Sequence, residues 1–253
     1  MPAQAAKIYF ASDLHLGAPN LSDSHRREQR FLQWLQLIEQ DASELYILGD
    51  LFDFWFEYHT VVPRGYVRTL GKLAELSDAG LPIHFFTGNH DLWMFGYFEQ
   101  ELGIKVHRQT QLRTIEDKVF LIGHGDGLGP NDLKYKFIKK YIFTNRLCQS
   151  LLHWLHPDIG IGIANHFSRR SRLANGTKDE QFLGEQNEWL VQYAQRKLQQ
   201  QHIDFFVFGH RHLPLQIPIQ KSQYINTGDW IKYNTYAIYH QQSMQLCHFP
   251  TKM

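Results

Sequence analysis

Five short apolar runs, each followed at once by Asp, His or Asn, constrain the fold of this chain more than any other feature. The runs are rich in β-favouring residues, which is typical of buried strands. In a parallel α/β sheet the carboxyl ends of the strands meet at one edge, where ligands bind. The sequence therefore predicts an α/β fold in which the polar clusters form one site. The runs with their clusters are IYFASDLH (8–15), LYILGD (45–50), IHFFTGNHD (83–91), VFLIGHGD (119–126) and FFVFGHRH (205–212).

Amphipathic segments between the runs predict the helices that connect the strands. Gly80 and Pro82 follow the second of these segments as stop signals. With 253 residues, 43% of them hydrophobic, the chain can bury the core of one domain spanning 1–253. After the last run, apolar and polar residues alternate, which favours further strands. The expected helices are 24–40, 66–79 and 177–201, and the expected late strands are 224–227, 235–239 and 244–249.

The segment 127–176 interrupts this alternation of strands and helices. Aromatic and basic residues interleave over 131–156, and the apolar stretch 159–164 precedes the basic run SRRSR at 168–172. We expect a helical insertion, or cap, within the domain. The composition fits an ordinary helical excursion with a charged outer face as well as it fits a lid. A lid with an apolar surface and a basic rim would suit an acyl chain and an anionic head group.

Overall composition bounds the partners and the compartment. A net charge of +1 with histidine neutral provides no global basic field for nucleic acid. The two cysteines, Cys148 and Cys247, form neither a disulfide framework nor a C-x-x-C metal site, which suits a reducing compartment. The start MPAQAAKIYF lacks the apolar core of a signal peptide, and no apolar stretch reaches the roughly 18 to 20 residues of a membrane-spanning helix. We expect a cytoplasmic protein, and its oligomeric state stays open.

The polar clusters supply the side chains that bind divalent metal ions. In an extended segment residues i and i+2 point the same way, so the D-x-H and H-x-H spacings place two donors together. Any one of these residues has an ordinary structural explanation, but all of them follow strand-like runs. Seven oxygen and nitrogen donors without sulfur suit two ions that share Asp50 as a bridge. The candidate ligands are Asp13, His15, Asp50, Asn89, His124, His210 and His212.

Two further features lie beside these ligands. His90 follows the candidate ligand Asn89, so it could meet a phosphoryl oxygen or a leaving group, and Asp91 could orient its other nitrogen. A pair of ions activates water and neutralises phosphoryl oxygens, so we expect hydrolysis of a phosphate ester or anhydride. The aromatic cluster FDFWF (52–56) is interpreted either as core or as the wall of an apolar pocket.

As an ordered set, these motifs resemble the calcineurin-like metallophosphoesterases. The motifs are D-x-H (13–15), G-D (49–50), G-N-H-D (88–91), G-H (123–124) and G-H-x-H (209–212), and together they cover most of the chain. The resemblance implies a two-sheet β-sandwich flanked by helices. It also implies that one ion is held by Asp13, His15, Asp50 and His212, and the other by Asp50, Asn89, His124 and His210.

Within that family, SDLHLG, GDLFDFW, the helical insertion and GHRHLP look like the lipid A branch of Gram-negative bacteria. That branch implies attack at the α-phosphate of UDP-2,3-diacylglucosamine, giving UMP and 2,3-diacylglucosamine 1-phosphate, usually with Mn²⁺. It also implies peripheral association with the cytoplasmic face of the inner membrane. The branch usually has arginine where this chain has His90. The positions that match its substrate contacts are Asn89, His90, Asp132, Ser171, Asn175, Lys178 and His210.

Two other functions remain open from the sequence. The same chemistry could act on another nucleotide or phosphodiester, and the contact between the insertion and the core would discriminate between these substrates. Alternatively, the fold could serve as a non-catalytic binding scaffold. Such scaffolds usually lose metal ligands, whereas this chain keeps all seven candidates.

Overall fold

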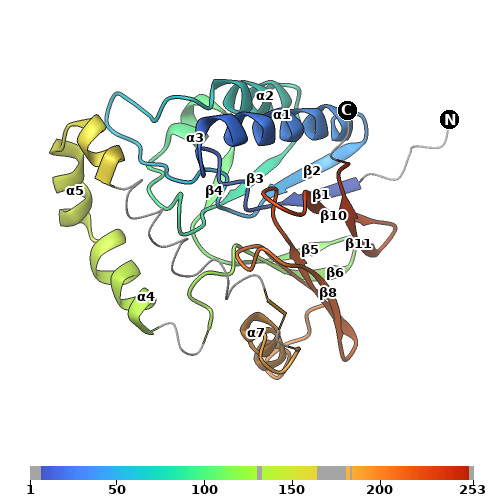
Figure 1. Ribbon diagram of the computed structural model, residues 1–253. Helices are drawn as coiled ribbons and strands as arrows, with labels where there is room; N and C mark the ends of the chain where they lie inside the picture. Colours follow the sequence, from blue (N-terminus) through green and yellow to red (C-terminus); the bar gives the residue numbers. More distant parts are fainter. Residues whose placement is uncertain (1–6, 130–132, 164–180, 183, 251–253) are drawn as a thin grey trace.

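The computed structural model describes residues 7–129, 133–163, 181–182 and 184–250. Two mixed β-sheets pack face to face, with helices on their outer faces (Figure 1). This architecture confirms the predicted α/β fold with two sheets flanked by helices.

The first sheet has six strands in the order β11-β10-β1-β2-β3-β4. Strands β1, β2, β3 and β4 run parallel, while β10 and β11 form an antiparallel hairpin beside β1. The parallel arrangement places the carboxyl ends of β1, β2 and β3 at one edge. The strands are β1 Lys7–Ala11, β2 Ala42–Ile47, β3 Ile83–Phe86, β4 Lys105–His107, β10 Thr235–His240 and β11 Ser243–His248.

The second sheet has five strands in the order β5-β6-β7-β9-β8. Its central strands β6, β7 and β9 are parallel, and β5 and β8 pair antiparallel at the two edges. The edge strand β8 contains two prolines, which lack the amide proton that a central strand needs. The strands are β5 Gln111–Ile115, β6 Lys118–Ile122, β7 Phe205–Phe208, β8 Pro214–Ile219 and β9 Ser222–Thr227.

Successive side chains of a strand point to opposite faces of its sheet, so the core is divided into layers. In β1, Ile8 and Phe10 face the space between the sheets, where Phe10 stacks on Phe120 of β6 with ring centroids 6.5 Å apart. Tyr9 and Ala11 face the opposite way, into a second apolar cluster with α1 and α2. A third cluster lies between the second sheet and α7. The covering helices are α1 Leu21–Ile38, α2 Val67–Asp78 and α7 Trp189–Leu198, and the short α3 Tyr97–Glu101 precedes β4.

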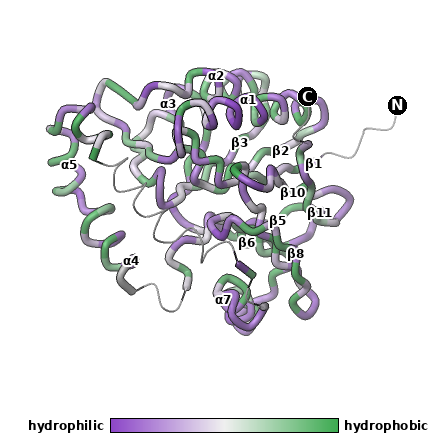
Figure 2. The backbone as a smooth tube through the Cα atoms, viewed as in Figure 1, coloured by the Kyte–Doolittle hydropathy of each residue, from purple (hydrophilic) through white to green (hydrophobic). Residues whose placement is uncertain are grey.

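The described residues 133–163, which follow β6, are largely helical. They contain α4 Leu133–Ile138, the π-helix η1 Lys139–Phe143 and α5 Arg146–Trp154, and residues 157–163 are also helical. In Figure 1, α4 and α5 stand at one side of the sheets, and in Figure 2 apolar and polar residues alternate along them.

The helix expected over 177–201 is shorter in the structure. Among the described residues of that range, helix is present only in α7, and the turn at 185–187 precedes it. Gly184 adopts a φ of 90°, which lies outside the right-handed helical region. Glu188 then acts as the N-cap residue, so the helix begins at Trp189.

Candidate metal centre

Loops at the carboxyl ends of five parallel strands carry the candidate ligands. In the first sheet, Asp13 follows β1, Asp50 follows β2 and Asn89 follows β3. In the second sheet, His124 follows β6, and His210 and His212 follow β7. Backbone hydrogen bonds join these loops: the Asp13 N–H donates to the Gly49 carbonyl at 3.1 Å, and the Gly209 N–H donates to the His124 carbonyl at 2.9 Å.

The first group of donors consists of Asp13, His15 and His212, whose ligand atoms lie within 4.8 Å of one another. Nε2 of His15 and Nε2 of His212 are 3.2 Å apart, and Oδ1 of Asp13 is 3.4 Å from the His212 nitrogen. Oδ2 of Asp50 lies 3.6 Å from Nε2 of His15. Four donor atoms from three loops therefore face one small volume.

The second group shares Asp50 with the first. Nε2 of His124 lies 3.4 Å from Oδ2 of Asp50, 3.2 Å from Oδ1 of Asn89 and 3.2 Å from Nδ1 of His210. The same carboxylate oxygen thus approaches a histidine of each group. This arrangement is the one expected of a carboxylate that bridges two ions.

The chemistry of these donors fits divalent metal ions. Two pairs of imidazole nitrogens approach to 3.2 Å, and two protonated rings would repel each other at that distance. Oδ1 of Asp13 is buried and has no hydrogen-bond donor among the described residues. A buried acceptor without a donor is costly unless a cation or water satisfies it. Oxygen and imidazole donors without sulfur suit Mn, Fe or Zn.

Electrostatics keep both carboxylates in the form that binds metal. Burial opposes ionisation of Asp50, but the neighbouring His124 outweighs it and holds the pKa of Asp50 well below its ordinary value. Burial likewise opposes ionisation of Asp13, and His212 lowers its pKa to about 2. Both groups are therefore anionic near neutral pH, as metal ligands must be.

Five of the candidate ligands have left-handed backbone conformations. The φ angles are 55° for Asp13, 45° for His15, 52° for Asp50, 70° for His210 and 53° for His212. The D-x-H and H-x-H pairs are therefore not extended, and our expectation that strand alternation aligns them was wrong. Side chains with a Cβ rarely adopt this region, and such residues concentrate at functional sites.

Two glycines let the loops approach each other at the centre. A Cβ on Gly88 would lie 2.1 Å from Oδ1 of Asp50, and a Cβ on Gly49 would lie 2.7 Å from Nδ1 of His124. Gly49 also has a φ of 91°. Only glycine fits either position without displacing a candidate ligand.

Hydrogen-bond acceptors on the outer side of three histidine rings fix which ring nitrogen faces the centre. Nδ1–H of His124 donates to the Leu48 carbonyl at 2.7 Å, and Nδ1–H of His212 donates to Asp229 at 3.2 Å. Oδ1 of Asp53 lies 3.6 Å from Nδ1 of His15. Because Nδ1 carries the proton in such pairs, Nε2 presents its lone pair to an ion. We had not predicted these roles for Asp53 and Asp229: Asp53 follows Asp50 by three residues, and Asp229 follows the end of β9 by two.

His90 lies at the edge of the centre and is oriented by Asp53. Its Nδ1 donates to the Asp53 carbonyl at 2.9 Å, and its ring meets the ring of His15 edge-on at 4.7 Å. Burial lowers the pKa of His90 to about 4, although Asp50 opposes the shift.

Asp91 has a different contact from the one we expected. Its carboxylate accepts the N–H groups of Gly88 at 2.7 Å and Leu51 at 2.9 Å, so it joins two ligand loops rather than orienting His90. Burial and the nearby Asp50 raise the pKa of Asp91 to about 7. Orientation of His90 comes from Asp53 instead.

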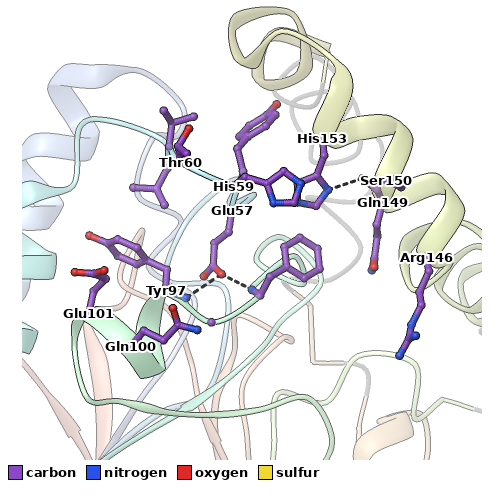
Figure 3. A pocket seen from close by; sticks show the side chains of 15 residues that line it. Glu57, His59, Thr60, Tyr97, Gln100, Glu101, Arg146, Gln149, Ser150 and His153 are labelled. Carbon is purple, nitrogen blue, oxygen red and sulfur yellow. Dashed lines mark hydrogen bonds between the residues drawn. The ribbon is translucent and has the colours of Figure 1, made fainter.

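The aromatic cluster after Asp50 forms core. Phe52, Phe54, Trp55 and Phe56 are all buried. A pocket of about 710 Å³ lies beyond them, between the loop 57–62, the segment 95–101 and α5 (Figure 3). Glu57 lies at its floor and accepts the N–H of Tyr97 at 3.1 Å. The residues expected to contact substrate from the insertion, Asp132, Ser171, Asn175 and Lys178, lie outside the described residues.

Comparisons with known proteins identify the family of this chain. The family model for calcineurin-like phosphoesterase matches residues 6–214. A UDP-2,3-diacylglucosamine hydrolase of Porphyromonas gingivalis is 37% identical over 252 residues, covering 92% of this chain and 94% of that protein. The protein of the same name in Haemophilus ducreyi is 29% identical over 225 residues, covering 88% and 91%. A solved E. coli phosphoesterase is 17% identical with a TM-score of 0.47, covering 96% of this chain and all of that one.

Proposed function

Since this chain belongs to the calcineurin-like phosphoesterase family, we propose that it hydrolyses the pyrophosphate bond of UDP-2,3-diacylglucosamine with two divalent metal ions. Attack at the α-phosphate would release UMP and 2,3-diacylglucosamine 1-phosphate. The observation that carries the proposal is the convergence of six other donors on Asp50. The names of the curated relatives supply the substrate.

In this proposal each ion has its own set of side chains. Asp13, His15, Asp50 and His212 would hold one ion, and Asp50, Asn89, His124 and His210 would hold the other. Two such ions, which we propose to be Mn²⁺, would activate water and neutralise charge on the phosphoryl oxygens.

His90 would move the proton at the reacting phosphate. Since Nδ1 donates to the Asp53 carbonyl, Nε2 is the ring nitrogen that would exchange a proton with the substrate. Asn89 and His210 would contact the phosphate from within the centre. Asp91 would act indirectly, because its carboxylate holds the backbone of Gly88 and Leu51.

The exposed surface of the helical segment supports a lipid substrate. Nine of the 17 large hydrophobic side chains exposed in the described residues lie between 137 and 163. On α5, Leu147, Leu151 and Trp154 follow one another at helical spacing and are 69%, 65% and 88% exposed. This face is not closed against the core, as it would be in an ordinary helical excursion. We therefore propose that 127–176 is a lid inserted into a single domain and that it holds the acyl chains.

The same helices support contact with a membrane surface. Lys136, Lys139, Lys140 and Arg146 accompany the exposed apolar residues, and Asp158 is the sole acidic residue of 133–163. An apolar face with a basic rim binds the surface of anionic membranes. No helix of the described residues is long and apolar enough to cross a bilayer. We propose peripheral association with the cytoplasmic face of the inner membrane.

Product analysis tests the substrate. Purified protein loaded with Mn²⁺ would be incubated with UDP-2,3-diacylglucosamine, and the products would be identified by mass spectrometry. We expect UMP and the lipid 1-phosphate from the wild type and neither from an Asp50→Ala variant. In ¹⁸O-labelled water the label should enter UMP, because attack falls on the α-phosphate. Label in the lipid phosphate would contradict the proposed site of attack.

A second candidate function is hydrolysis of another nucleotide or phosphodiester. His90 favours it, because the lipid A branch usually has arginine at that position. Cleavage of bis(p-nitrophenyl) phosphate without release of UMP from the lipid nucleotide would support this alternative. Tight metal binding without cleavage of either substrate would support a non-catalytic scaffold.

A further inference from the structure

Two ion pairs connect the ends of the segment 127–188 to the histidine loops of the second sheet. We define the first loop as residues 123–126, which carries His124, and the second loop as residues 209–212, which carries His210 and His212. Each loop contains one charged residue that is not a candidate ligand. In the first loop it is Asp126, and in the second it is Arg211.

Asp126 binds the helices at the start of the segment. Its carboxylate accepts the hydroxyl of Tyr135 in α4 at 2.5 Å and the ammonium of Lys139 in η1 at 2.6 Å. The Asp126 side chain is largely buried, although Lys139 remains partly exposed.

Arg211 binds the residue at the end of the segment. Its Nε donates to Oε1 of Glu188 at 2.8 Å, and Nη2 donates to Oε2 at 3.1 Å, so the pair is bidentate. Both side chains are buried. Glu188 is the N-cap residue of α7, which packs on the second sheet through Leu190 and Val191.

The position of Arg211 bears on the backbone of the second loop. Arg211 stands between His210 and His212, which both have left-handed backbone conformations. Such conformations persist only where surrounding contacts hold them. A bidentate guanidinium contact fixes orientation as well as distance, which a single hydrogen bond does not. Glu188 therefore restrains the residue that links two candidate ligands.

We propose that Asp126 and Arg211 are positioning residues that tie the two histidine loops to the helices beside them, Asp126 to α4 and η1 and Arg211 to the N-cap of α7, so that the candidate ligands keep one relative geometry. The proposal rests on the proposed function, because it assumes that the loops hold ions. Neither residue would touch substrate or ions. Each would act through the loop that contains it.

The test measures Mn²⁺ binding and backbone exchange rather than turnover of the lipid. In Glu188→Gln we expect Mn²⁺ affinity, measured by EPR titration, to fall about 10- to 100-fold, as for other groups that orient ligands. Hydrogen exchange of the amides at 209–213 in metal-free protein should become faster. In Asp126→Asn the faster exchange should appear at 123–128 and in α4.

Asp204→Asn is the matched control. Asp204 precedes β7 at the end remote from the centre, where it accepts the Val119 N–H at 2.8 Å. Its loss should lower the melting temperature without changing Mn²⁺ affinity or exchange at 209–213. If Glu188→Gln does not fold, Arg211→Lys keeps the charge but loses the bidentate contact, and an intermediate loss of affinity is expected.

Two results would overturn different parts of the proposal. If wild-type protein binds Mn²⁺ and the variants at Glu188 and Asp126 bind it equally well with unchanged exchange, the pairs contribute only to stability. If wild-type protein binds no Mn²⁺, the proposed function itself fails, and the positioning role fails with it. Cleavage of bis(p-nitrophenyl) phosphate, measured in parallel, reports on the centre independently of the lipid substrate.

Discussion

The candidate metal centre and the helices of residues 133–163 differ most in the exposure of the side chains that define them. Asp13, Asp50 and His124 are almost completely buried at strand ends, while Leu147 and Trp154 project from α5 into solvent. Fixed, desolvated groups suit bond cleavage, because they need no reorganisation during reaction. Exposed apolar groups suit a large flexible ligand. On the proposed function, the sheets would determine the chemistry and the helices would determine the substrate.

The largest expected effect comes from removing the shared carboxylate. Asp50→Ala should lower kcat by about 10³-fold or more toward both the lipid nucleotide and bis(p-nitrophenyl) phosphate, because both ions lose a ligand. Steady-state kinetics at saturating Mn²⁺ would measure this loss. Asp41→Asn, a change near the protein surface, serves as the control. Near-normal turnover by Asp50→Ala would rule out a bridging role.

A smaller loss is expected when His90 is replaced. His90→Ala should reduce kcat by about 10²-fold toward both substrates, because a proton donor or acceptor is lost. Both ions should remain, because we assign His90 no role as a ligand, and elemental analysis of the variant checks this. A variant that retains one ion per chain would instead make His90 a ligand.

Substitution in the segment after α5 should separate the two substrates. Lys178→Met should raise KM for the lipid nucleotide by about tenfold, because one charge-assisted hydrogen bond to phosphate is lost. KM for bis(p-nitrophenyl) phosphate should stay unchanged, since that substrate has no second phosphate. An equal rise for both substrates would place Lys178 at the metal centre.

The smallest effect is expected on the exposed face of α5. Trp154→Ser should lower severalfold the affinity for vesicles that contain anionic lipid, measured as the fraction of protein that sediments with them. The reason is that the serine side chain can no longer bury apolar surface at the membrane. Activity toward bis(p-nitrophenyl) phosphate should not change. Ile231→Ser, at another exposed apolar position, serves as the control. Equal binding by wild type and Trp154→Ser would remove α5 from the membrane contact.

That the candidate ligands lie close together could be predicted because the signals are local. The five predicted apolar runs lie in strands β1, β2, β3, β6 and β7, and the candidate ligands lie in the loops that follow these strands. The parallel strands of the two mixed sheets then bring together groups that are 199 positions apart, since Asp13 and His212 follow their strands at the same edge.

Other parts of the structure depend on tertiary contacts that the sequence does not display. Asp53 orients His90 although the two residues are 37 positions apart, and this contact exists only in the folded chain. We expected Asp91 in this role because it is the next residue in the sequence. The helix over 177–201 was predicted too long because a buried partner, Arg211, holds Glu188 at the helix start. Strand β8 was missed because its prolines are tolerated only at the sheet edge.

The most direct test of the metal centre is to count its ions and to measure whether they are magnetically coupled. Protein saturated with Mn²⁺ and freed of excess metal would be examined by elemental analysis and EPR spectroscopy. We predict two Mn²⁺ per chain and a spectrum of exchange-coupled ions, with the coupling lost in Asp50→Ala. One Mn²⁺ per chain, or two uncoupled ions in the wild type, would contradict a centre bridged by Asp50.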